Sequence, residues 1–138
     1  MKDGLVRREV DALIARFFAA FDNRGDARPQ IATVTRCFAG KAVVVRHDRE
    51  AAEFYTVLEF AAPRIRLLTD GTLVQFHEWE ETSSTQVFGG IAARVSRYAK
   101  AGILDGKAYS GSGTKCFHLV DTGQEWRISS LAWVDDGG

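Results

Sequence analysis

The spacing of apolar residues changes once along this chain, near residue 72, and that change limits the folds open to it. Before it, apolar residues recur every three or four positions and predict an amphipathic helix over about 4–22, built on Val10, Leu13, Ile14, Phe17, Phe18 and Phe21. After it, side chains alternate with a period of two, which is typical of strands. Helices followed by strands predict an α+β fold, with the helices gathered on one face of a mainly antiparallel sheet.

The remainder of the first half predicts two more helices and one strand. A short helix is expected between Asp26 and Gly40, followed by a buried strand over 42–46. A third helix is expected to begin at Asp48, which can cap it, and to kink or restart at Pro63, which removes a backbone donor. The predicted apolar stripe of this helix consists of Phe54, Tyr55, Leu58 and Ala62.

The second half predicts four strands joined by short turns, an antiparallel meander. The first strand begins at Leu73 and ends at a turn over 82–84. The others span 86–101, with a bulge or bend at 89–90, then 107–120 and 126–135. One domain, 1–138, with a core over about 8–136, is expected to hold all these elements.

Composition excludes several classes of protein. Eighteen basic and eighteen acidic residues cancel, and 46% of the chain is hydrophobic, which argues against disorder and against nucleic-acid binding. No apolar run approaches the roughly 20 residues of a membrane span, and the charged N-terminus lacks the apolar stretch of a secretory leader, so cytoplasmic residence is expected. Cys37 and Cys116 lack a metal-ligand spacing; they are expected to be two buried thiols, with a single long-range disulfide as the alternative, and no metal and no cofactor is predicted.

The strand pattern separates the sheet residues into two faces. One face combines apolar and small polar groups, as a pocket wall does, and is predicted to point inward: Ala93, Val95, Arg97, Ser112, Thr114, Cys116, His118, Trp126, Ile128, Ser130 and Ala132. The other face mixes charges with Phe117, Leu131 and Trp133, and is predicted to be the outer face through which two copies form a homodimer.

Candidate site residues follow from this assignment. His77 and Trp79 alternate with Glu78 and Glu80, a pair expected on the wetted face, so His77 and Trp79 are predicted to point inward. His77 could act as acid or base at neutral pH, or be a core histidine held by backbone or water. The predicted ligand contacts are Phe17, Phe21, Phe54, Trp79, Cys116, His118 and Ser130.

Two further side chains could polarise a substrate oxygen. The Tyr55 hydroxyl could donate to a carbonyl, or lie at the surface of the protein. An inward Arg97 needs an anionic partner, which is a carboxylate of a ligand or of the chain itself, unless the side chain lies at the open rim.

The chain resembles the SnoaL-like branch of the nuclear-transport-factor-2-like (ketosteroid isomerase-like) superfamily, as an uncharacterised bacterial member. The residues that carry this resemblance are the helical opening from Val10 to Phe17, and the segments 70–73 (DGTL), 97–102 (RYAKAG), 111–115 (GSGTK), 123–128 (GQEWRI) and 133–136 (WVDD). The resemblance implies a cone-shaped roll, in which a strongly curved sheet wraps three helices around a pocket, and dimers that form through the outer sheet face. The catalytic residue sets of ketosteroid isomerases and of scytalone dehydratase have no match here.

Three functions remain open at this point. The first is an enzyme of isomerase, cyclase or dehydratase type, using acid–base chemistry on an apolar, oxygenated substrate without a cofactor. The second is a binder of a small apolar or carboxylate-bearing molecule, and the third is a dimeric interaction domain. An enzyme predicts at least two titratable groups that converge in one cavity, whereas a binder predicts an apolar pocket with a single polar anchor.

Overall fold

Helices fill the first half of the structure and a strand meander fills the second, as the change of spacing predicts. The computed structural model describes residues 2–137. Its helices and strands are α1 (Lys2–Ala19), α2 (Ile31–Thr35), β1 (Phe38–His47), β2 (Ala52–Thr56), α3 (Val57–Thr69), β3 (Leu73–Phe88), β4 (Ile91–Leu104), β5 (Lys107–Asp121) and β6 (Trp126–Asp135). The predicted α+β class is therefore confirmed.

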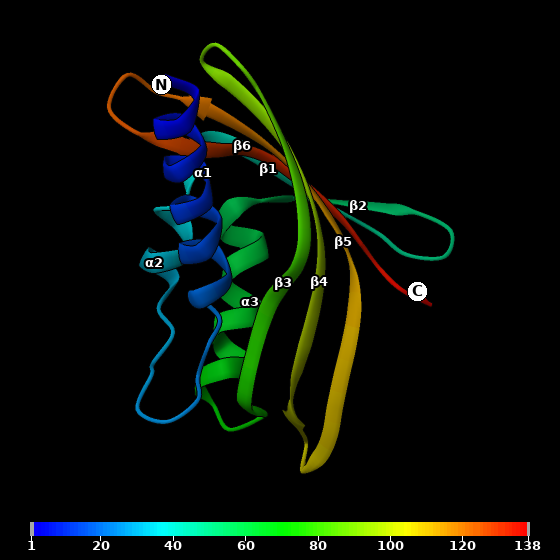
Figure 1. Cartoon of the computed structure of the whole chain (residues 1–138). Helices are drawn as coiled ribbons and strands as arrows, with labels where there is room; N and C mark the ends of the chain where they lie inside the picture. The colour runs from blue at the N-terminus through cyan, green and yellow to red at the C-terminus, as the bar shows by residue number, and fades with distance from the viewer. Residues whose placement is uncertain (1, 138) are drawn as a thin grey trace.

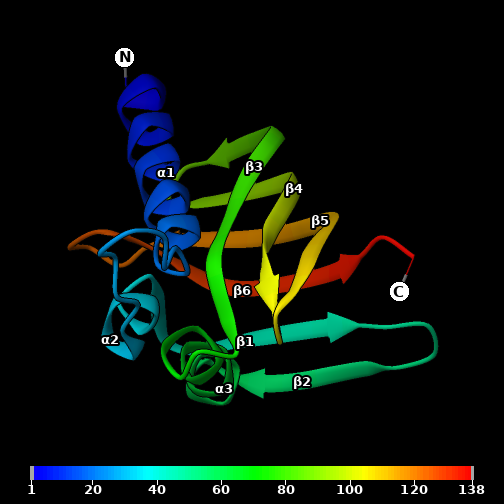
Figure 2. The same ribbon diagram turned by 90° about the horizontal axis from the view of Figure 1, so that it is seen from below.

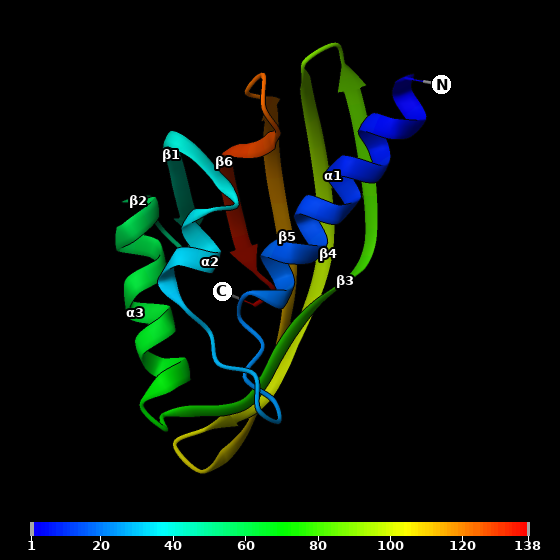
Figure 3. The ribbon, with the colours of Figure 1, turned by 90° about the vertical axis from the view of Figure 1, so that its left-hand side faces the viewer.

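The strands form one six-stranded sheet in the order β2-β1-β6-β5-β4-β3. The pair β1–β6 is parallel, and every other neighbouring pair is antiparallel. All three helices cover the same face of the sheet (Figures 1 and 3). The sheet curves around them without closing (Figure 2), so the predicted cone-shaped roll is confirmed.

The apolar stripe of α1 forms the centre of the core. Its side chains from Val10 to Phe21 are at most 6% exposed. The Phe17 ring meets the rings of Phe21, Phe38 and Phe117 edge-on, with centroids 5.3–6.0 Å apart, a favoured aromatic geometry. No helix within residues 2–137 is long and apolar enough to cross a membrane.

The third helix begins later than predicted, because a hairpin of β1 and β2 precedes it. Phe54 and Tyr55 lie on β2 rather than on a helix, and Tyr55 pairs with Val44 of β1. A capping box starts α3 instead: the Glu59 amide donates to the Thr56 hydroxyl at 3.1 Å, and the Thr56 amide donates to the Glu59 carboxylate at 2.8 Å. These two bonds satisfy donors that a helix start leaves unpaired, and the helix then continues through Pro63.

The first strand of the meander also runs further than predicted. The expected turn at 82–84 is wrong, since β3 continues through it to Phe88. The chain reverses at Gly89 and Gly90, where a bulge was expected, and Gly89 has a φ of +57°. A two-residue hairpin turn needs positive φ, which glycine adopts without steric cost.

The two faces of the sheet are the reverse of the prediction for most positions. Phe117, Leu131 and Trp133 point inward and are at most 7% exposed. Trp126 and Ile128 are buried on the same side, because a bulge at Ser129 shifts the β5–β6 register between His118 and Leu119. One extra residue in a strand exchanges the faces of everything beyond it.

The inner face also carries charged side chains, and the prediction placed this face outside because of them. In the structure these charges are paired with opposite charges. Arg94, only 5% exposed, donates to Glu80 at 2.6 Å and to Asp11 of α1 at 2.6 Å. Glu78 and Glu80 therefore face the helices, whereas His77 and Trp79, predicted to line the inner cavity, do not line it. A buried charge is tolerated when an opposite charge and hydrogen bonds replace its hydration.

Candidate functional site

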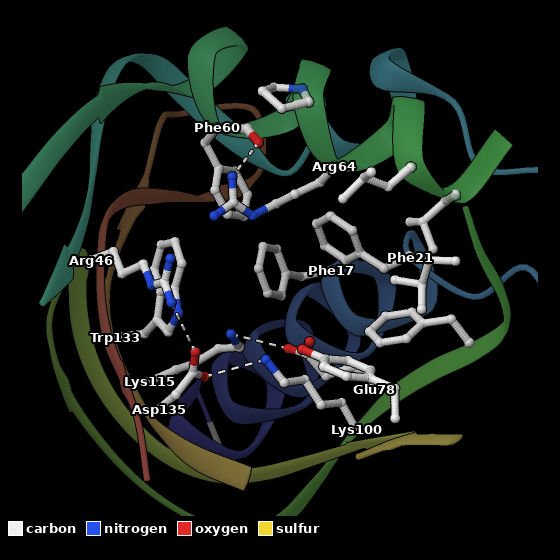
Figure 4. A pocket seen from close by; sticks show the side chains of 16 residues that line it. Phe17, Phe21, Arg46, Phe60, Arg64, Glu78, Lys100, Lys115, Trp133 and Asp135 are labelled. Carbon is white, nitrogen blue, oxygen red and sulfur yellow. Dashed lines mark hydrogen bonds and ion pairs between the residues drawn. The ribbon is translucent and has the colours of Figure 1, made fainter. Parts of the chain in front are cut away.

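A cavity of about 380 Å³ lies between the concave face of the sheet, α3 and the C-terminal end of α1 (Figure 4). Most of its wall is apolar and aromatic, and comes from Phe17, Phe21, Phe60, Pro63, Leu67, Leu68, Leu73, Phe76 and Trp133. Its size falls in the range of small-molecule sites. The curvature of the sheet and the separation of α1 from α3 create this space.

Three ion pairs, formed by two acidic residues, lie along one side of this cavity (Figure 4). The Lys115 ammonium of β5 is 3.0 Å from a carboxylate oxygen of Glu78 on β3. The Asp135 carboxylate at the end of β6 is 3.4 Å from the Lys100 ammonium and 3.6 Å from the Arg46 guanidinium. Strands β1, β3, β4, β5 and β6 thus bring acids and bases together in one place.

Lys115 is the most enclosed of these groups. The residue is 5% exposed, and its ammonium lies 4.0 Å from the centre of the Tyr98 ring and 5.2 Å from that of Trp133. Burial lowers the pKa of Lys115, because the charged form loses its hydration, and the nearby Glu78 carboxylate offsets only part of that loss. The Lys115 ammonium therefore gives up a proton more readily than a surface lysine.

The Tyr98 hydroxyl donates a hydrogen bond to Asp135 from inside the core. Burial, together with this carboxylate, raises the pKa of Tyr98 and keeps the phenol protonated. Burial alone would raise the pKa of Asp135, but the Tyr98 hydrogen bond and the Lys100 charge outweigh it and lower that pKa. Asp135 is thus held ionised at one end of the cavity.

Arg64 reaches the cavity from α3, on the side opposite the ion pairs (Figure 4). Its guanidinium lies over the Phe60 ring at 4.5 Å and over the Trp133 ring at 5.1 Å. One of its nitrogens donates to the Phe60 carbonyl oxygen at 2.9 Å. Burial lowers the pKa of Arg64, so its surroundings disfavour the positive charge that it carries.

The aromatic residues predicted to contact a ligand separate into two groups. Phe17 and Phe21 line the cavity, so their role as ligand contacts stays a prediction with a suitable location. Phe54 does not line it and is 70% exposed. Tyr55 does not line the cavity, because it lies on the β2 hairpin rather than on α3; its hydroxyl donates to Glu53 at 2.7 Å, and its ring centre lies 5.7 Å from the guanidinium of Arg64.

His77 and Trp79 lie outside this cavity. Their rings stack with centroids 4.5 Å apart. They border a separate hollow between α1 and β3, which also contains Asp22 and Arg24. The bulge between Val74 and His77, where Gln75 has a φ of +51°, places Phe76 and Glu78 on the cavity side and His77 on the other.

The remaining predicted residues lie on the outer face of the sheet. Arg97 pairs with Asp136 at 2.6 Å, so its partner is a carboxylate of the chain itself. His118 and Ser130 are neighbours, with the imidazole Nδ1 3.2 Å from the hydroxyl. Cys116 is exposed, contrary to the predicted burial, whereas Cys37 is buried, and both thiols are free.

Sequence reasoning missed the charged residues of the cavity. The signal was available in one place. Lys115 lies two positions from Phe117, and Tyr98 lies two positions from Ser96, so one face of the strands contained both aromatic and charged groups. That mixture was interpreted as an outer, dimer-forming face, although an interior with paired charges gives the same pattern. Within residues 2–137, no three side chains of the metal-ligating types cluster closely enough to hold a metal ion.

Comparison with known proteins relates the chain to others through its fold. No family model and no curated protein matches the sequence. Among solved structures, it is similar to a nuclear transport factor 2-like superfamily protein from Salmonella enterica serovar Typhimurium, with a TM-score of 0.78 and 13% identity over 99% of this chain and 94% of that one. The predicted resemblance to the nuclear-transport-factor-2-like superfamily is therefore confirmed at the level of fold.

Two other similar structures illustrate how varied proteins of this shape are. The hexachlorocyclohexane dehydrochlorinase LinA-type3 from Novosphingobium barchaimii matches with a TM-score of 0.75 and 13% identity, over 96% of this chain and 87% of that one. A nuclear transport factor 2-like protein from Novosphingobium aromaticivorans matches with a TM-score of 0.71 and 18% identity, over 96% of this chain and 83% of that one. Fold alone does not assign function, so the cavity must be interpreted from its own residues.

Proposed function

We propose that this protein is an enzyme that catalyses proton transfer on a small apolar, oxygenated molecule bound in the cavity, with its own side chains as acid and base. The observation that carries the proposal is the Lys115–Glu78 pair, 3.0 Å apart, in the wall of an aromatic cavity of about 380 Å³. A pure binder needs one polar anchor, whereas this wall has several titratable groups from different strands. One of the structures with a similar fold is a dehydrochlorinase, and the proposal that this chain is an enzyme is consistent with that.

The two groups have complementary roles in this proposal. The Glu78 carboxylate accepts a proton from a substrate carbon next to a carbonyl group; the electron pair of the broken C–H bond forms a carbon–carbon double bond, and the π pair of the carbonyl moves onto its oxygen. The Lys115 ammonium donates a hydrogen bond to that oxygen as its charge develops. The lowered pKa of Lys115 makes this donation stronger. Return of the proton to another carbon gives isomerisation, and loss of a leaving group gives elimination.

Hydrogen–deuterium exchange tests this step without knowledge of the natural substrate. The protein is incubated in deuterated water with a panel of aromatic and cyclic ketones, and deuterium uptake next to the carbonyl is followed by NMR. We expect wild-type protein to accelerate exchange for at least one ketone. Glu78→Gln and Lys115→Met should each reduce that acceleration by about 100-fold or more, the usual contribution of a positioned acid or base.

The matched control is Arg97→Gln, which removes a charge from the outer face and should leave the exchange rate unchanged. Circular dichroism of each variant separates loss of the site from loss of the fold. If no ketone exchanges faster with wild-type protein than with Glu78→Gln, the proposed acid–base role is wrong and the cavity is left with a binding role.

We also propose that two copies associate through the outer face of the sheet, although not through the residues first expected there. Val95, Cys116, Ala132 and Val45 lie in one row across four adjacent strands. Val95 is 47% exposed on this row. A row of apolar groups on the surface can meet its own copy about a two-fold axis.

A further inference from the structure

The cavity wall carries an excess of positive charge, although the chain as a whole is neutral. Four basic side chains line it, Arg46, Arg64, Lys100 and Lys115, against two acidic ones, Glu78 and Asp135. The ion pairs occupy both acids. The cavity lining therefore has a net charge of +2 beside a largely apolar wall, and the cost of an uncompensated charge falls mainly on Arg64, since the Arg46 side chain is 39% exposed.

Arg64 accounts for one of the two uncompensated charges. Among residues 2–137, no carboxylate lies within 4.0 Å of its guanidinium, which lies over the Phe60 and Trp133 rings, 5.7 Å from the Tyr55 ring centre, and donates to the Phe60 carbonyl oxygen. A carbonyl oxygen uses one of the five N–H donors of an arginine and carries no full charge. The remaining donors are available to an anion in the cavity.

Arg46 is the second cation with unused hydrogen-bonding capacity. Its Nε is buried and has no hydrogen-bond partner among the described residues. Its contact with Asp135, at 3.6 Å, is longer than a hydrogen bond. The charge of Arg46 is also close enough to contribute to the lowered pKa of Arg64, so an anion between them would stabilise both.

We propose that the substrate of this cavity is an aromatic carboxylic acid, whose carboxylate binds Arg64 and Arg46 and whose ring packs against Phe17 and Phe21. The inference rests on the proposed function in taking this cavity as the site of reaction. A planar carboxylate matches the fork of a guanidinium, and the aromatic remainder of the wall suits a ring. The cavity volume of about 380 Å³ suits a molecule of one or two rings.

Binding of simple probes tests this proposal independently of catalysis. The affinities of 3-phenylpropionate, its neutral amide and phenyl phosphate are measured by NMR titration of the intact protein. We expect the carboxylate to bind about 10-fold or more tightly than the amide, since a hydrogen bond to a charged group is worth more than a neutral one. Arg64→Met keeps an unbranched apolar chain over Phe60 and should abolish that preference.

Two further variants keep the test decisive. Arg46→Met should weaken the preference and serves in place of Arg64→Met if that variant does not fold. Arg97→Met, on the outer face, should leave the preference intact. Equal affinity for acid and amide, absence of any acid binding, or a preference that survives both cavity variants would overturn the proposal, and tighter binding of phenyl phosphate would replace carboxylate by phosphate.

The two proposals fail separately. Carboxylate binding that depends on Arg64, without deuterium exchange in any ketone or keto acid, supports the anchor and contradicts the catalytic role of Glu78 and Lys115. Exchange that Glu78→Gln abolishes, in ketones with and without a carboxylate alike, supports the catalytic role and contradicts the anchor.

Discussion

At the scale of single residues, Asp135 connects the core of the protein to its cavity. It accepts a hydrogen bond from Tyr98 in the interior and lies 3.4 Å from Lys100 in the cavity wall. The same carboxylate therefore stabilises the fold and balances charge in the site. Because its pKa is lowered in the folded state, folding favours the ionised form.

Asp135→Asn should change how stability depends on pH. A carboxyl group with a depressed folded pKa stabilises the fold above its unfolded pKa, near 3.8, and loses that contribution as pH falls through the folded value. We expect the variant to be about 1–3 kcal/mol less stable than wild type at neutral pH, the cost of weakening a charged hydrogen bond. The difference should shrink as pH falls below about 4 and wild-type Asp135 takes up its proton.

Urea unfolding at several pH values measures this difference. Asp26→Asn, which changes an exposed carboxylate in the loop before α2, is the matched control and should follow the wild-type curve. A gap between Asp135→Asn and wild type that stays constant down to the lowest pH would show that ionisation of Asp135 does not stabilise the fold.

At the scale of elements, strand β5 leaves space for the Tyr98 side chain because the residue opposite it is a glycine. Tyr98 on β4 pairs with Gly113 on β5. A Cβ at position 113 would overlap the Tyr98 hydroxyl and the Val134 carbonyl oxygen. The missing side chain thus leaves the space in which the Tyr98 hydroxyl reaches Asp135.

Gly113→Ala should therefore destabilise the protein by about 1–3 kcal/mol, the usual cost of forcing extra volume into a packed site. Neither overlapping group is the end of a flexible side chain on the surface, so relief requires movement of the tyrosine or of β6. Thermal unfolding measures the change. Gly40→Ala in β1, where nothing lies within 4 Å of an added Cβ, is the control. Equal melting temperatures for the two variants would contradict this account of Gly113.

The elements also show how far the sequence could predict this structure. The stripe of α1 and the strand 126–135 are local patterns, and both were predicted closely. The start of α3 was predictable as well, since Thr56 and Glu59 have capping-box spacing. The bulge at Ser129 has no such local signature, yet it decides which face of β6 is buried.

The site was harder to predict than the fold, because its key contact is not local. Lys115 and Glu78 lie on two strands that β4 separates, and only the register of the sheet brings them within 3.0 Å. Sequence patterns treat each charge as a solvated group, whereas the folded chain pairs the two and buries them. The one histidine with a catalytic assignment, His77, was placed on the wrong face by the same reasoning.

At the scale of the whole molecule, the curved sheet has two surfaces with different uses. Its concave face holds the helices, the core and the cavity (Figure 3). Its convex face has no helix over it and presents the row of Val95, Cys116, Ala132 and Val45. Association through this face would leave the cavity wall in each copy intact.

The proposed dimer predicts a particle of twice the 15.2 kDa chain mass in solution at micromolar concentration. Light scattering after size-exclusion chromatography measures that mass. Val95→Glu places a charge at one end of the row, on a surface that the dimer would bury, so it should shift the protein to monomer. Leu5→Glu changes another exposed apolar residue, on α1, and should leave the mass unchanged. A wild-type monomer, or a dimer that Val95→Glu leaves intact, would show that the convex face is not the interface.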